Sequence, residues 1–467
     1  PTSFHPLSCL TCPGTPQRSR ATTTLAILRG DAFASIQPWP PMSEISGLPR
    51  DGGRWSLIFL TSAAALPAPL LRILEVSGGP HPDLPPTVEA MVFGLGIFAA
   101  ATLLTWASEV AETEVSAGLA LVALALIAVL PEYAVDLYFA WTAPTNPEHA
   151  HLAVANMTGG NRLLVGLAWP TVFAVYFLRY RNRVMPVLRA NALGILFLGG
   201  ATAYSFSIPI RGELSLLDTG VMFAIFGAYL YLASKSPPET EREFVGPAAA
   251  MAALPKVPRR LAVGAIFLYA AAVIFAAAEP FANALVDTGE TLGVDKFVLV
   301  QWVAPLASES PEFILAGLLA ARGRHDAGMT VLISSKVNQW TLLIGSLPLA
   351  YSISGSTLSP LDFDTRQAEE VFLTAGQSMF AVAILVSLTV AWWEAVVLAA
   401  LFVTQLFFFD TSVRIGYGAA YCALAAIVFG RDVTRLANFG SAVRETAAGV
   451  PRIGAASGVG PGRTEPG

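Results

Sequence analysis

Charged residues are scarce in this sequence. Lys, Arg, Asp and Glu make up 13% of its 467 residues, whereas an ordinary soluble protein carries about 25%. Hydrophobic residues make up 54%, and the mean hydropathy is +0.59. A soluble fold could not remove so much apolar surface from water. The composition therefore excludes a soluble enzyme and predicts a polytopic integral membrane protein whose main partner is the lipid bilayer.

Cysteine is also rare, with only Cys9, Cys12 and Cys422 in the chain. Three cysteines cannot build a disulfide framework, and the Cys9-x-x-Cys12 pair lacks the second pair that a zinc site needs. The net charge of −5 is small, and no basic, aromatic-interleaved patch suggests nucleic acid binding. No nucleophile–base pair or phosphate loop suggests a membrane enzyme. We therefore expect no enzyme activity, no cofactor, no nucleic acid and no obligate protein partner.

The first 41 residues differ from the rest of the chain. They are rich in Pro, Ser, Thr and Arg, show no helical period and do not follow the pattern of a signal peptide. Met42 then opens a short polar lead before the first apolar run. We expect Met42 to be the initiator and residues 1–56 to be a disordered or mis-annotated start plus this lead; N-terminal sequencing of the natural protein would test this.

Apolar runs of about 20 residues, the length that crosses a bilayer as a helix, occur about twelve times. The predicted spans are 57–75, 88–110, 115–141, 149–177, 188–207, 216–234, 261–285, 295–320, 327–351, 369–391, 393–409 and 413–430. The polar segment 235–260 is predicted to be a cytoplasmic linker, and 431–467 a disordered cytoplasmic tail. Residues 57–87 and 410–430 are expected to add one extra helix at each end.

Basic residues outside the spans indicate the orientation. With twelve spans, the clusters at 50–54, 179–189, 235–260, 322–324 and 431–435 all fall on one side, which predicts that this side and both termini are cytoplasmic. The blocks 88–234 and 261–409 then hold five helices each and have opposite topology. The predicted fold is all-α, with two inverted five-helix repeats. The Arg-, Ala- and Gly-rich composition, without a eukaryotic regulatory loop, suggests a bacterial inner (plasma) membrane.

Two stretches, 124–166 and 299–345, place polar residues in the middle of predicted spans. Each carries a Pro-Glu pair, Pro131-Glu132 in the first and Pro311-Glu312 in the second. An ionisable residue at bilayer depth is costly and indicates a function. A proline inside a helix also frees a backbone carbonyl. Carboxylate and carbonyl oxygens suit hard cations, so Glu132 and Glu312 are the predicted metal-binding residues of a transporter built from repeats.

The helix that follows each Pro-Glu pair offers neutral oxygens that could complete such a site. These are Asn156, Thr158, Asn161, Ser334, Ser335, Asn338 and Gln339. Gly159 and Gly160 would let neighbouring backbones approach closely. The alternative is that the two glutamates are structural carboxylates that bridge helices, and that the asparagines only form interhelical hydrogen bonds.

Both stretches resemble the alpha-repeats of the sodium/calcium exchanger family, the cation/calcium antiporters. The family pattern is roughly G-T-S-x-P-E on one helix and G-N-x-x-G-S-N-x-x-N on the next, once per half. Both Pro-Glu pairs match, as do Asn156, Gly159 and Asn161. The G-T-S positions of the second half hold Ala307, Ser308 and Glu309, which makes Ser308 and Glu309 further candidate ligands. The resemblance implies a secondary antiporter that exchanges calcium against sodium, potassium or protons by alternating access.

Charged departures from the pattern leave the transported ion open. Lys336 replaces an asparagine and, with Arg162, is a possible counter-ion that competes with a metal for carboxylate oxygens. Glu309 shares a helix face with Glu312, and Asp136 shares one with Glu132, so both acids could offset this charge.

The transported ions could therefore be calcium and sodium, or sodium and protons in a monovalent cation/proton antiporter. A non-transporting membrane scaffold or sensor with a degenerate site is the third hypothesis. Lys336 discriminates between them. If it pairs with Glu309 or Glu312, calcium is disfavoured, and if it reaches the membrane surface, calcium is favoured.

Overall fold

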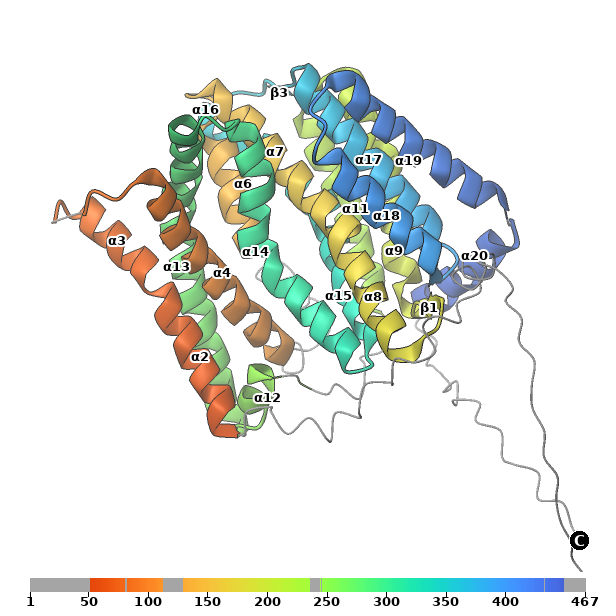
Figure 1. Cartoon of the computed structure of the whole chain (residues 1–467), viewed down its shortest axis with the longest axis horizontal. Coiled ribbons are helices and arrows are strands. Elements are labelled where there is room, and N and C mark those ends of the chain that lie inside the picture. Colours follow the sequence, from red (N-terminus) through yellow and green to blue (C-terminus); the bar gives the residue numbers. More distant parts are fainter. Residues whose placement is uncertain are drawn as a thin grey trace, which may run out of the picture. The chain divides into compact units, whose positions relative to one another are not determined.

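The computed structural model describes residues 51–79, 82–111, 129–235, 244, 246–431 and 433–448. Helices dominate this part of the chain (Figure 1). The first half contains α2 (Asp51–Ala65), α3 (Pro67–Val76), α4 (Pro86–Ala111), α6 (Leu130–Thr142), α7 (Pro147–Leu163), η2 (Leu164–Ala168), α8 (Trp169–Tyr180), β1 (Val184–Pro186), η3 (Arg189–Asn191), α9 (Ala192–Ser205), α10 (Ser207–Arg211), β2 (Glu213–Leu214) and α11 (Leu216–Ala233).

The second half follows a similar order of elements. It contains α12 (Pro247–Ala252), α13 (Lys256–Leu292), α14 (Lys296–Ala321), α15 (His325–Asn338), η4 (Gln339–Leu343), α16 (Ile344–Gly355), β3 (Leu361–Asp362), α17 (Thr365–Leu385), β4 (Thr389–Ala391), α18 (Trp392–Gln405), α19 (Thr411–Arg431) and α20 (Val433–Ala447). The predictions for residues 1–50, including Met42 as initiator, lie outside the described residues.

Nine helical segments of the described chain are long and apolar enough to cross a membrane. They are Arg54–Val76, Pro86–Ala111, Pro147–Tyr180, Arg189–Arg211, Leu216–Ala233, Lys256–Leu292, Lys296–Ala321, Thr365–Leu385 and Thr411–Arg431. Each coincides with a predicted span. Of the other three predictions, 393–409 forms the shorter helix α18, 327–351 forms α15–η4–α16, and 115–141 is described only from residue 129. The count of twelve therefore stays a prediction.

Two segments predicted as linker and tail contain helices instead. α12 and the start of α13 lie within 235–260, and α12 buries Ala248 and Met251 against α2 and α4. α20 lies within 431–467, where Arg189 donates hydrogen bonds to Ser441 (3.0 Å) and Glu445 (3.2 Å). Phe439 of α20 is also buried. Both helices have one apolar face that packs on the bundle, a pattern that the high Pro, Gly and Arg content of these segments obscures.

The two halves share an irregularity at equivalent positions. A π-helical turn, η2 or η4, interrupts the helix after α7 and after α15. The helices that follow, α8 and α16, both end on a left-handed residue, Arg181 (φ 53°) and Ser356 (φ 48°). The π turns begin 175 residues apart, at 164 and 339, and the left-handed residues lie 175 apart, at 181 and 356. This constant interval matches the second half of each site residue by residue.

Contacts at the helix ends show that the repeats are inverted. Lys296 at the start of α14 lies 3.2 Å from Glu148 at the start of α7, and Arg179 at the end of α8 donates to the carbonyl of Ala321 at the end of α14 (2.8 Å). The α7–η2–α8 segment and α14 therefore run in the same direction. α6 packs on α7 across a short turn and runs the opposite way, so α6 is antiparallel to α14, its counterpart.

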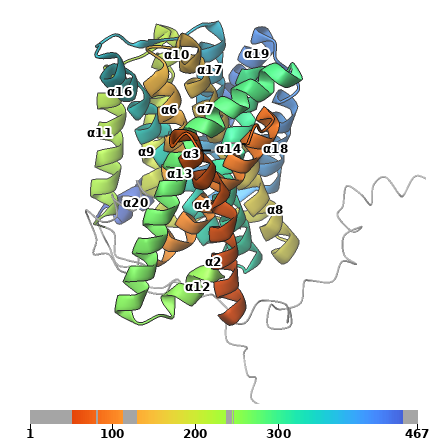
Figure 2. The same ribbon diagram turned by 90° about the vertical axis from the view of Figure 1, so that its left-hand side faces the viewer.

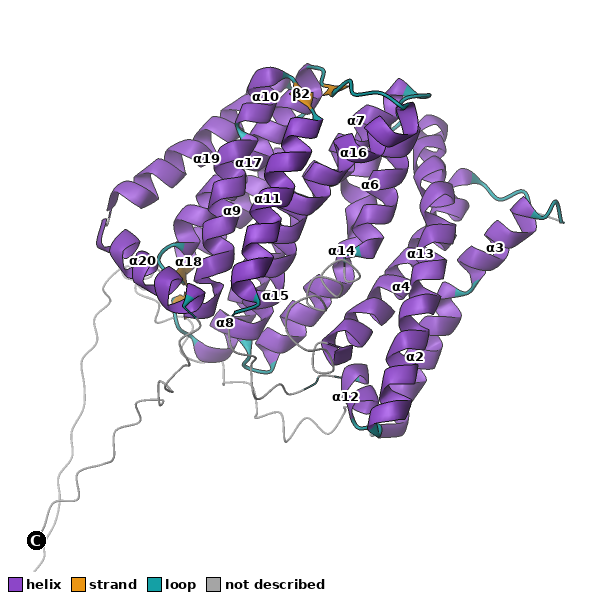
Figure 3. Cartoon of the chain, turned by 180° about the vertical axis from the view of Figure 1, so that it is seen from behind, coloured by secondary structure: helices purple, strands orange, loops and turns teal. Residues whose placement is uncertain are grey.

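Two antiparallel strand pairs follow the same symmetry. β1 pairs with β4 and β2 pairs with β3, each joining a strand of one half to a strand of the other. Exchanging the halves places β1 on β3 and β2 on β4, so one pair maps onto the other. Figure 3 shows how short these strands are beside the helices. The prediction of an all-α fold with two inverted repeats is confirmed.

The buried apolar residues fall mainly into two clusters. The smaller one joins α2, α4, α12 and the first half of α13, and includes Ile58, Leu103, Met251 and Ile274. The larger one joins the remaining helices around Trp340 and Phe380. Figures 1 and 2 show α2, α3, α4, α12 and α13 grouped on one side of the bundle. The first helix of each repeat thus packs against its counterpart, away from the second helices.

Candidate functional site

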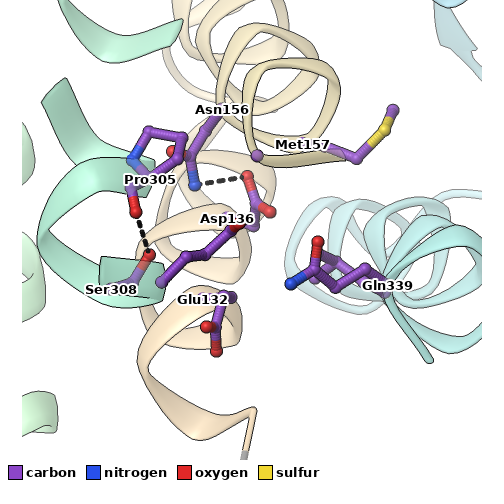
Figure 4. Close-up of a pocket in the computed structure, with 10 residues that line it drawn as sticks. Glu132, Asp136, Asn156, Met157, Pro305, Ser308 and Gln339 are labelled. Carbon is purple, nitrogen blue, oxygen red and sulfur yellow. Dashed lines mark hydrogen bonds between the residues drawn. The ribbon is translucent and has the colours of Figure 1, made fainter. Parts of the chain in front are cut away.

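A narrow pocket lies where α6, α7, α14 and η4 meet (Figure 4). It is lined by Glu132, Asp136, Asn156, Met157, Gly160, Pro305, Ser308, Glu309, Gln339 and Leu343. α6 begins at Leu130 with Pro131 in its first turn, so Glu132 and Asp136 lie one turn apart on the same face. In Figure 4, α6 lies between Pro305 and Ser308 of α14 on one side and Gln339 on the other. The pocket thus joins both repeats.

Four carboxylates from the two antiparallel Pro-Glu helices gather here. Glu132, Asp136 and Glu309 are buried, and Glu312 is partly buried. Glu132 interacts electrostatically with the other three, and Glu309 does so with Glu312 and Asp136. Within residues 129–235 and 246–431, none of the four forms an ion pair. Buried acids without a cationic partner are strongly disfavoured unless a ligand or proton compensates them, so we name these four residues the acid cluster.

Several oxygens in and beside the pocket lack a hydrogen-bond partner. They are Glu132 Oε2, Asn156 Oδ1, Glu309 Oε2, Glu312 Oε2 and Gln339 Oε1. Unpaired buried acceptors are rare in proteins, and carboxylate and amide oxygens are the ligands of hard cations. The described residues hold no group of three His, Cys, Asp or Glu side chains at metal-ligating spacing. The predicted metal ligands Glu132 and Glu312 therefore do not form a preassembled metal centre in this conformation.

α7 approaches the acid cluster through an asparagine and two glycines. Asn156 Nδ2 donates to Asp136 Oδ1 at 2.9 Å, which orients the asparagine and leaves its Oδ1 unpaired. A Cβ at position 159 would overlap the backbone oxygen of Gln301, and one at position 160 would overlap Oε1 of Glu309. The close approach expected of these glycines is therefore present, and Gly160 makes room for the Glu309 carboxylate.

Most of the other predicted neutral ligands are engaged elsewhere. Thr158 donates to the carbonyl of Val154 within its own helix (2.7 Å). Asn338 accepts a hydrogen bond from Tyr133 (3.1 Å), while Ser335 accepts one from Gln339 (3.3 Å) and contacts Glu312. Ser308 lines the pocket, with its hydroxyl 3.4 Å from the carbonyl of Ala304. Ser335 and Gln339 are thus held beside the acid cluster.

Ser334 differs from the expectation. It is exposed and interacts with Tyr229 of α11 rather than with the pocket. α15 is a regular helix at this point, and Ser335 and Gln339 share its pocket-facing side because they are four residues apart. The preceding residue therefore points to another side of the helix. A sequence pattern of consecutive serines does not reveal which one faces inward.

Lys336 takes neither of the two expected positions. Its side chain is fully buried, and Nζ donates to Oδ1 (2.8 Å) and to the backbone oxygen (3.1 Å) of Asn161. It also lies 4.5 Å from the ring centroid of Trp340. It interacts electrostatically with Glu309 but forms no ion pair within the described residues. Lys336 thus neither pairs with a pocket carboxylate nor reaches the membrane surface, and it holds the Asn161 oxygen that was a predicted cation ligand.

Arg162 belongs to a second charged group, which sequence reasoning missed. It pairs with Glu370 of α17, and Glu370 also pairs with Arg414 of α19, which lies 3.5 Å from Glu369. We name these four residues the arginine cluster. All are buried, and Arg162 also lies over the ring of Trp302 (5.0 Å). Arg162 is therefore not a counter-ion of the pocket. The adjacent acids Glu369-Glu370 in a predicted span were the available signal.

Comparisons with known proteins agree with these observations. The family model described as sodium/calcium exchanger protein matches residues 87–235 and 263–409, which coincide with the two repeats. The crystal structure of an H⁺/Ca²⁺ exchanger, CAX, is 40% identical, with a TM-score of 0.79. That match covers 85% of this chain and 99% of the other.

A second solved structure, of the selenium-substituted Ca²⁺/H⁺ antiporter protein YfkE, shares the fold at 19% identity and a TM-score of 0.55. It covers 75% of this chain and 98% of that chain. A search of curated proteins finds no match. The family model spans more than half of the sequence, and the 40% identical structure is covered almost completely. This chain therefore belongs to the sodium/calcium exchanger family.

Proposed function

We propose that this protein is a cation/calcium antiporter that exchanges calcium against protons at the acid cluster. The observation that carries this proposal is the set of four acids on antiparallel helices whose buried oxygens include unpaired acceptors. Calcium takes six to eight oxygen ligands, largely from carboxylates, carbonyls and amides. The acid cluster, Asn156, Ser308 and Gln339 offer such oxygens from both repeats.

The same charges favour protons as the exchanged ion. Without a bound cation, four acids in a largely buried site would carry an uncompensated negative charge, which is costly to desolvate. Protons that bind when calcium leaves remove this cost, so the two ions compete for one set of oxygens. The 40% identical relative is an H⁺/Ca²⁺ exchanger, which supports the same coupling.

Alternating access follows from how the repeats pack. α4 and α13 are the first helices of the two repeats, and they pack along each other within the smaller apolar cluster. The acid cluster lies on α6 and α14, which belong to the rest of the bundle. We propose that the α2–α4–α12–α13 group shifts against the rest and opens the pocket to one side at a time, as transporters of inverted repeats do.

A monovalent cation/proton antiporter is the second candidate. Lys336 favours it, since its positive charge lies beside Glu309 and reduces the attraction of the site for a divalent ion. The third hypothesis, a scaffold or sensor without transport, would make the acid cluster structural. Calcium remains the first choice because four acids face one lysine.

For the location, we propose a bacterial inner membrane with the basic end of the bundle in the cytoplasm. Arg179, Arg189 and the α14–α15 turn lie at one end, where they contact one another or α20. Glu148, Asp295 and Asp364 lie at the other end. An excess of Lys and Arg marks the cytoplasmic side of membrane proteins.

The test is ion flux in proteoliposomes that contain the wild type or the double variant Glu132→Gln plus Glu312→Gln. A pH gradient, and separately a sodium gradient, is set while calcium, sodium and proton movements are followed. We expect proton-driven calcium uptake in the wild type and only the leak of protein-free vesicles in the double variant. The matched control is Glu148→Gln plus Glu290→Gln, two exposed glutamates that contact Lys296 at the surface.

Each outcome selects one hypothesis. Proton-coupled sodium movement without calcium flux would select the monovalent antiporter. No cation flux from a folded, reconstituted wild type would select the scaffold and make the glutamates structural. Full calcium flux in the double variant would refute the acid cluster as the transport site.

A further inference from the structure

Lys336 and Asn161 are equivalent residues of the two repeats that contact each other. The 175-residue interval set by the π turns and by the left-handed residues joins position 161 to position 336. Equivalent residues of an inverted repeat can touch only where the repeats meet, near their pseudo-two-fold axis. At this central place one half presents an amide oxygen and the other half presents an ammonium.

The contact has the geometry of a bound cation. Lys336 Nζ lies 2.8 Å from Asn161 Oδ1 and 3.1 Å from the Asn161 carbonyl oxygen. The amide is oriented for this, because Asn161 Nδ2 donates to the carbonyl of Met157 (2.8 Å) and Oδ1 is left to face the ammonium. Amide and carbonyl oxygens are hard ligands of the kind that alkali and alkaline-earth ions take. The lysine therefore occupies ligands that a free cation could use.

The ammonium is fixed in place. The lysine is fully buried, and the Trp340 ring lies over its Nζ at 4.5 Å, a cation–π arrangement. Lys336 is three residues before Gln339, so the two side chains lie on one side of α15, and Gln339 lines the pocket. The fixed charge thus lies about one helical turn from the pocket.

The neighbouring acids make this charge selective. Glu132 and Glu312 are repeat counterparts, 180 residues apart, and the same interval places Ala316 opposite Asp136 and Val129 opposite Glu309. The chain therefore adds two acids and one lysine to the symmetric pair of glutamates. The four acids retain enough negative charge for a divalent ion, whereas a second, monovalent cation near Asn161 would meet repulsion from the ammonium.

We propose that Lys336 is a tethered cation that fills the place of a second transported ion at Asn161 and so excludes sodium as a coupling ion. This inference rests on the proposed calcium antiport at the acid cluster. It makes Lys336 a specificity-determining residue rather than a counter-ion of a single carboxylate.

Substituting Lys336 tests the proposal in the proteoliposome assay with calcium chloride and a sodium or a pH gradient. Lys336→Asn gives both repeats the same amide at this place, and we expect sodium-driven calcium uptake to rise from background to a measurable flux. Lys336→Arg keeps the charge and should remain insensitive to sodium. Lys336→Met removes the charge without supplying an oxygen ligand, so it should also gain no sodium-driven flux.

The outcomes separate this inference from the proposed function. Wild-type calcium uptake that responds to neither gradient refutes the proposed function, whatever the lysine variants do. Proton-driven uptake in Lys336→Asn without any sodium response refutes the tethered cation. Where Lys336→Asn does not reconstitute, Lys336→Gln carries the same test. Calcium flux of the wild type that sodium drives or inhibits overturns the inference without any variant.

Discussion

The acid cluster and the arginine cluster both contact α7, and both bury charge, yet they are paired differently. In the arginine cluster, Glu370 bonds to Arg162 and Arg414, and Glu369 lies beside Arg414. In the acid cluster, no ion pair to Glu132, Asp136, Glu309 or Glu312 occurs within residues 129–235 and 246–431, and carboxylate oxygens remain without partners. One region compensates its charge internally, while the other leaves that to a ligand or a proton.

The comparison shows that burial of charge does not by itself identify a transport site. A buried pair with both partners in place holds helices together, and here it ties α7 to α17 and to α19, which lies beyond the second repeat. Buried acids without a partner keep their attraction for a mobile cation. The difference predicts that one cluster controls stability and the other controls transport.

The largest expected effect breaks the arginine cluster. Glu370→Gln would leave Arg162 and Arg414 buried without their shared carboxylate. Removing one partner of a buried ion pair costs about 3–5 kcal/mol, because the remaining charge is uncompensated. We expect a strongly lowered thermal midpoint of the detergent-solubilised protein, measured by the fluorescence of its tryptophans.

The matched substitution in the acid cluster is Glu309→Gln, also a buried glutamate in a membrane helix. It removes an unpaired charge, so we expect unchanged or higher thermal stability together with reduced calcium uptake. If Glu309→Gln unfolds the protein as Glu370→Gln does, or if Glu370→Gln abolishes transport in a protein of normal stability, the distinction between the clusters is wrong.

The sequence predicted the fold well because membrane spans depend on local hydropathy. Nine spans coincide with helices of the described chain, and the inverted repeats follow from the spans and the basic residues between them. The Pro-Glu pairs also located the pocket, because prolines and acids are conspicuous inside apolar runs. α12 and α20 were missed because their apolar faces are short and lie in polar segments.

The side-chain partners could not be predicted, because they depend on the contacts between helices. Arg162 resembled a helix-end cation until α17 and α19 placed Glu370 and Arg414 beside it. Lys336 resembled a counter-ion of the glutamates, yet the close approach of the two repeats joins it to Asn161. Such contacts join residues 44 to 208 positions apart, a range over which sequence spacing carries no geometric information.

Adjacent glycines of α7 give a smaller effect that sharpens the comparison. A methyl group at Gly159 would overlap the backbone of Gln301, so Gly159→Ala must separate α7 from α14. Overpacking of this kind costs about 1–3 kcal/mol. At Gly160 the obstacle is the end of the Glu309 side chain, which can rotate away. We expect Gly159→Ala to lower the thermal midpoint, and Gly160→Ala to keep it while weakening calcium uptake at low calcium concentration.

These two variants control for each other, since the same methyl group is added one residue apart. Equal losses of stability would show that Gly160 serves helix packing alone. Unchanged calcium dependence in Gly160→Ala would show that the position of Glu309 does not matter for binding.

The smallest expected effect concerns the two serines of α15. Ser335 accepts a hydrogen bond from Gln339 and contacts Glu312, so Ser335→Ala removes one neutral interaction that orients a pocket residue. Such a bond contributes about 1 kcal/mol, which corresponds to a several-fold higher calcium concentration for half-maximal uptake. Ser334→Ala changes an exposed residue that faces α11, and should leave uptake unchanged. Calcium titrations of both variants decide this, because a register in which Ser334 faced the pocket would reverse the two results.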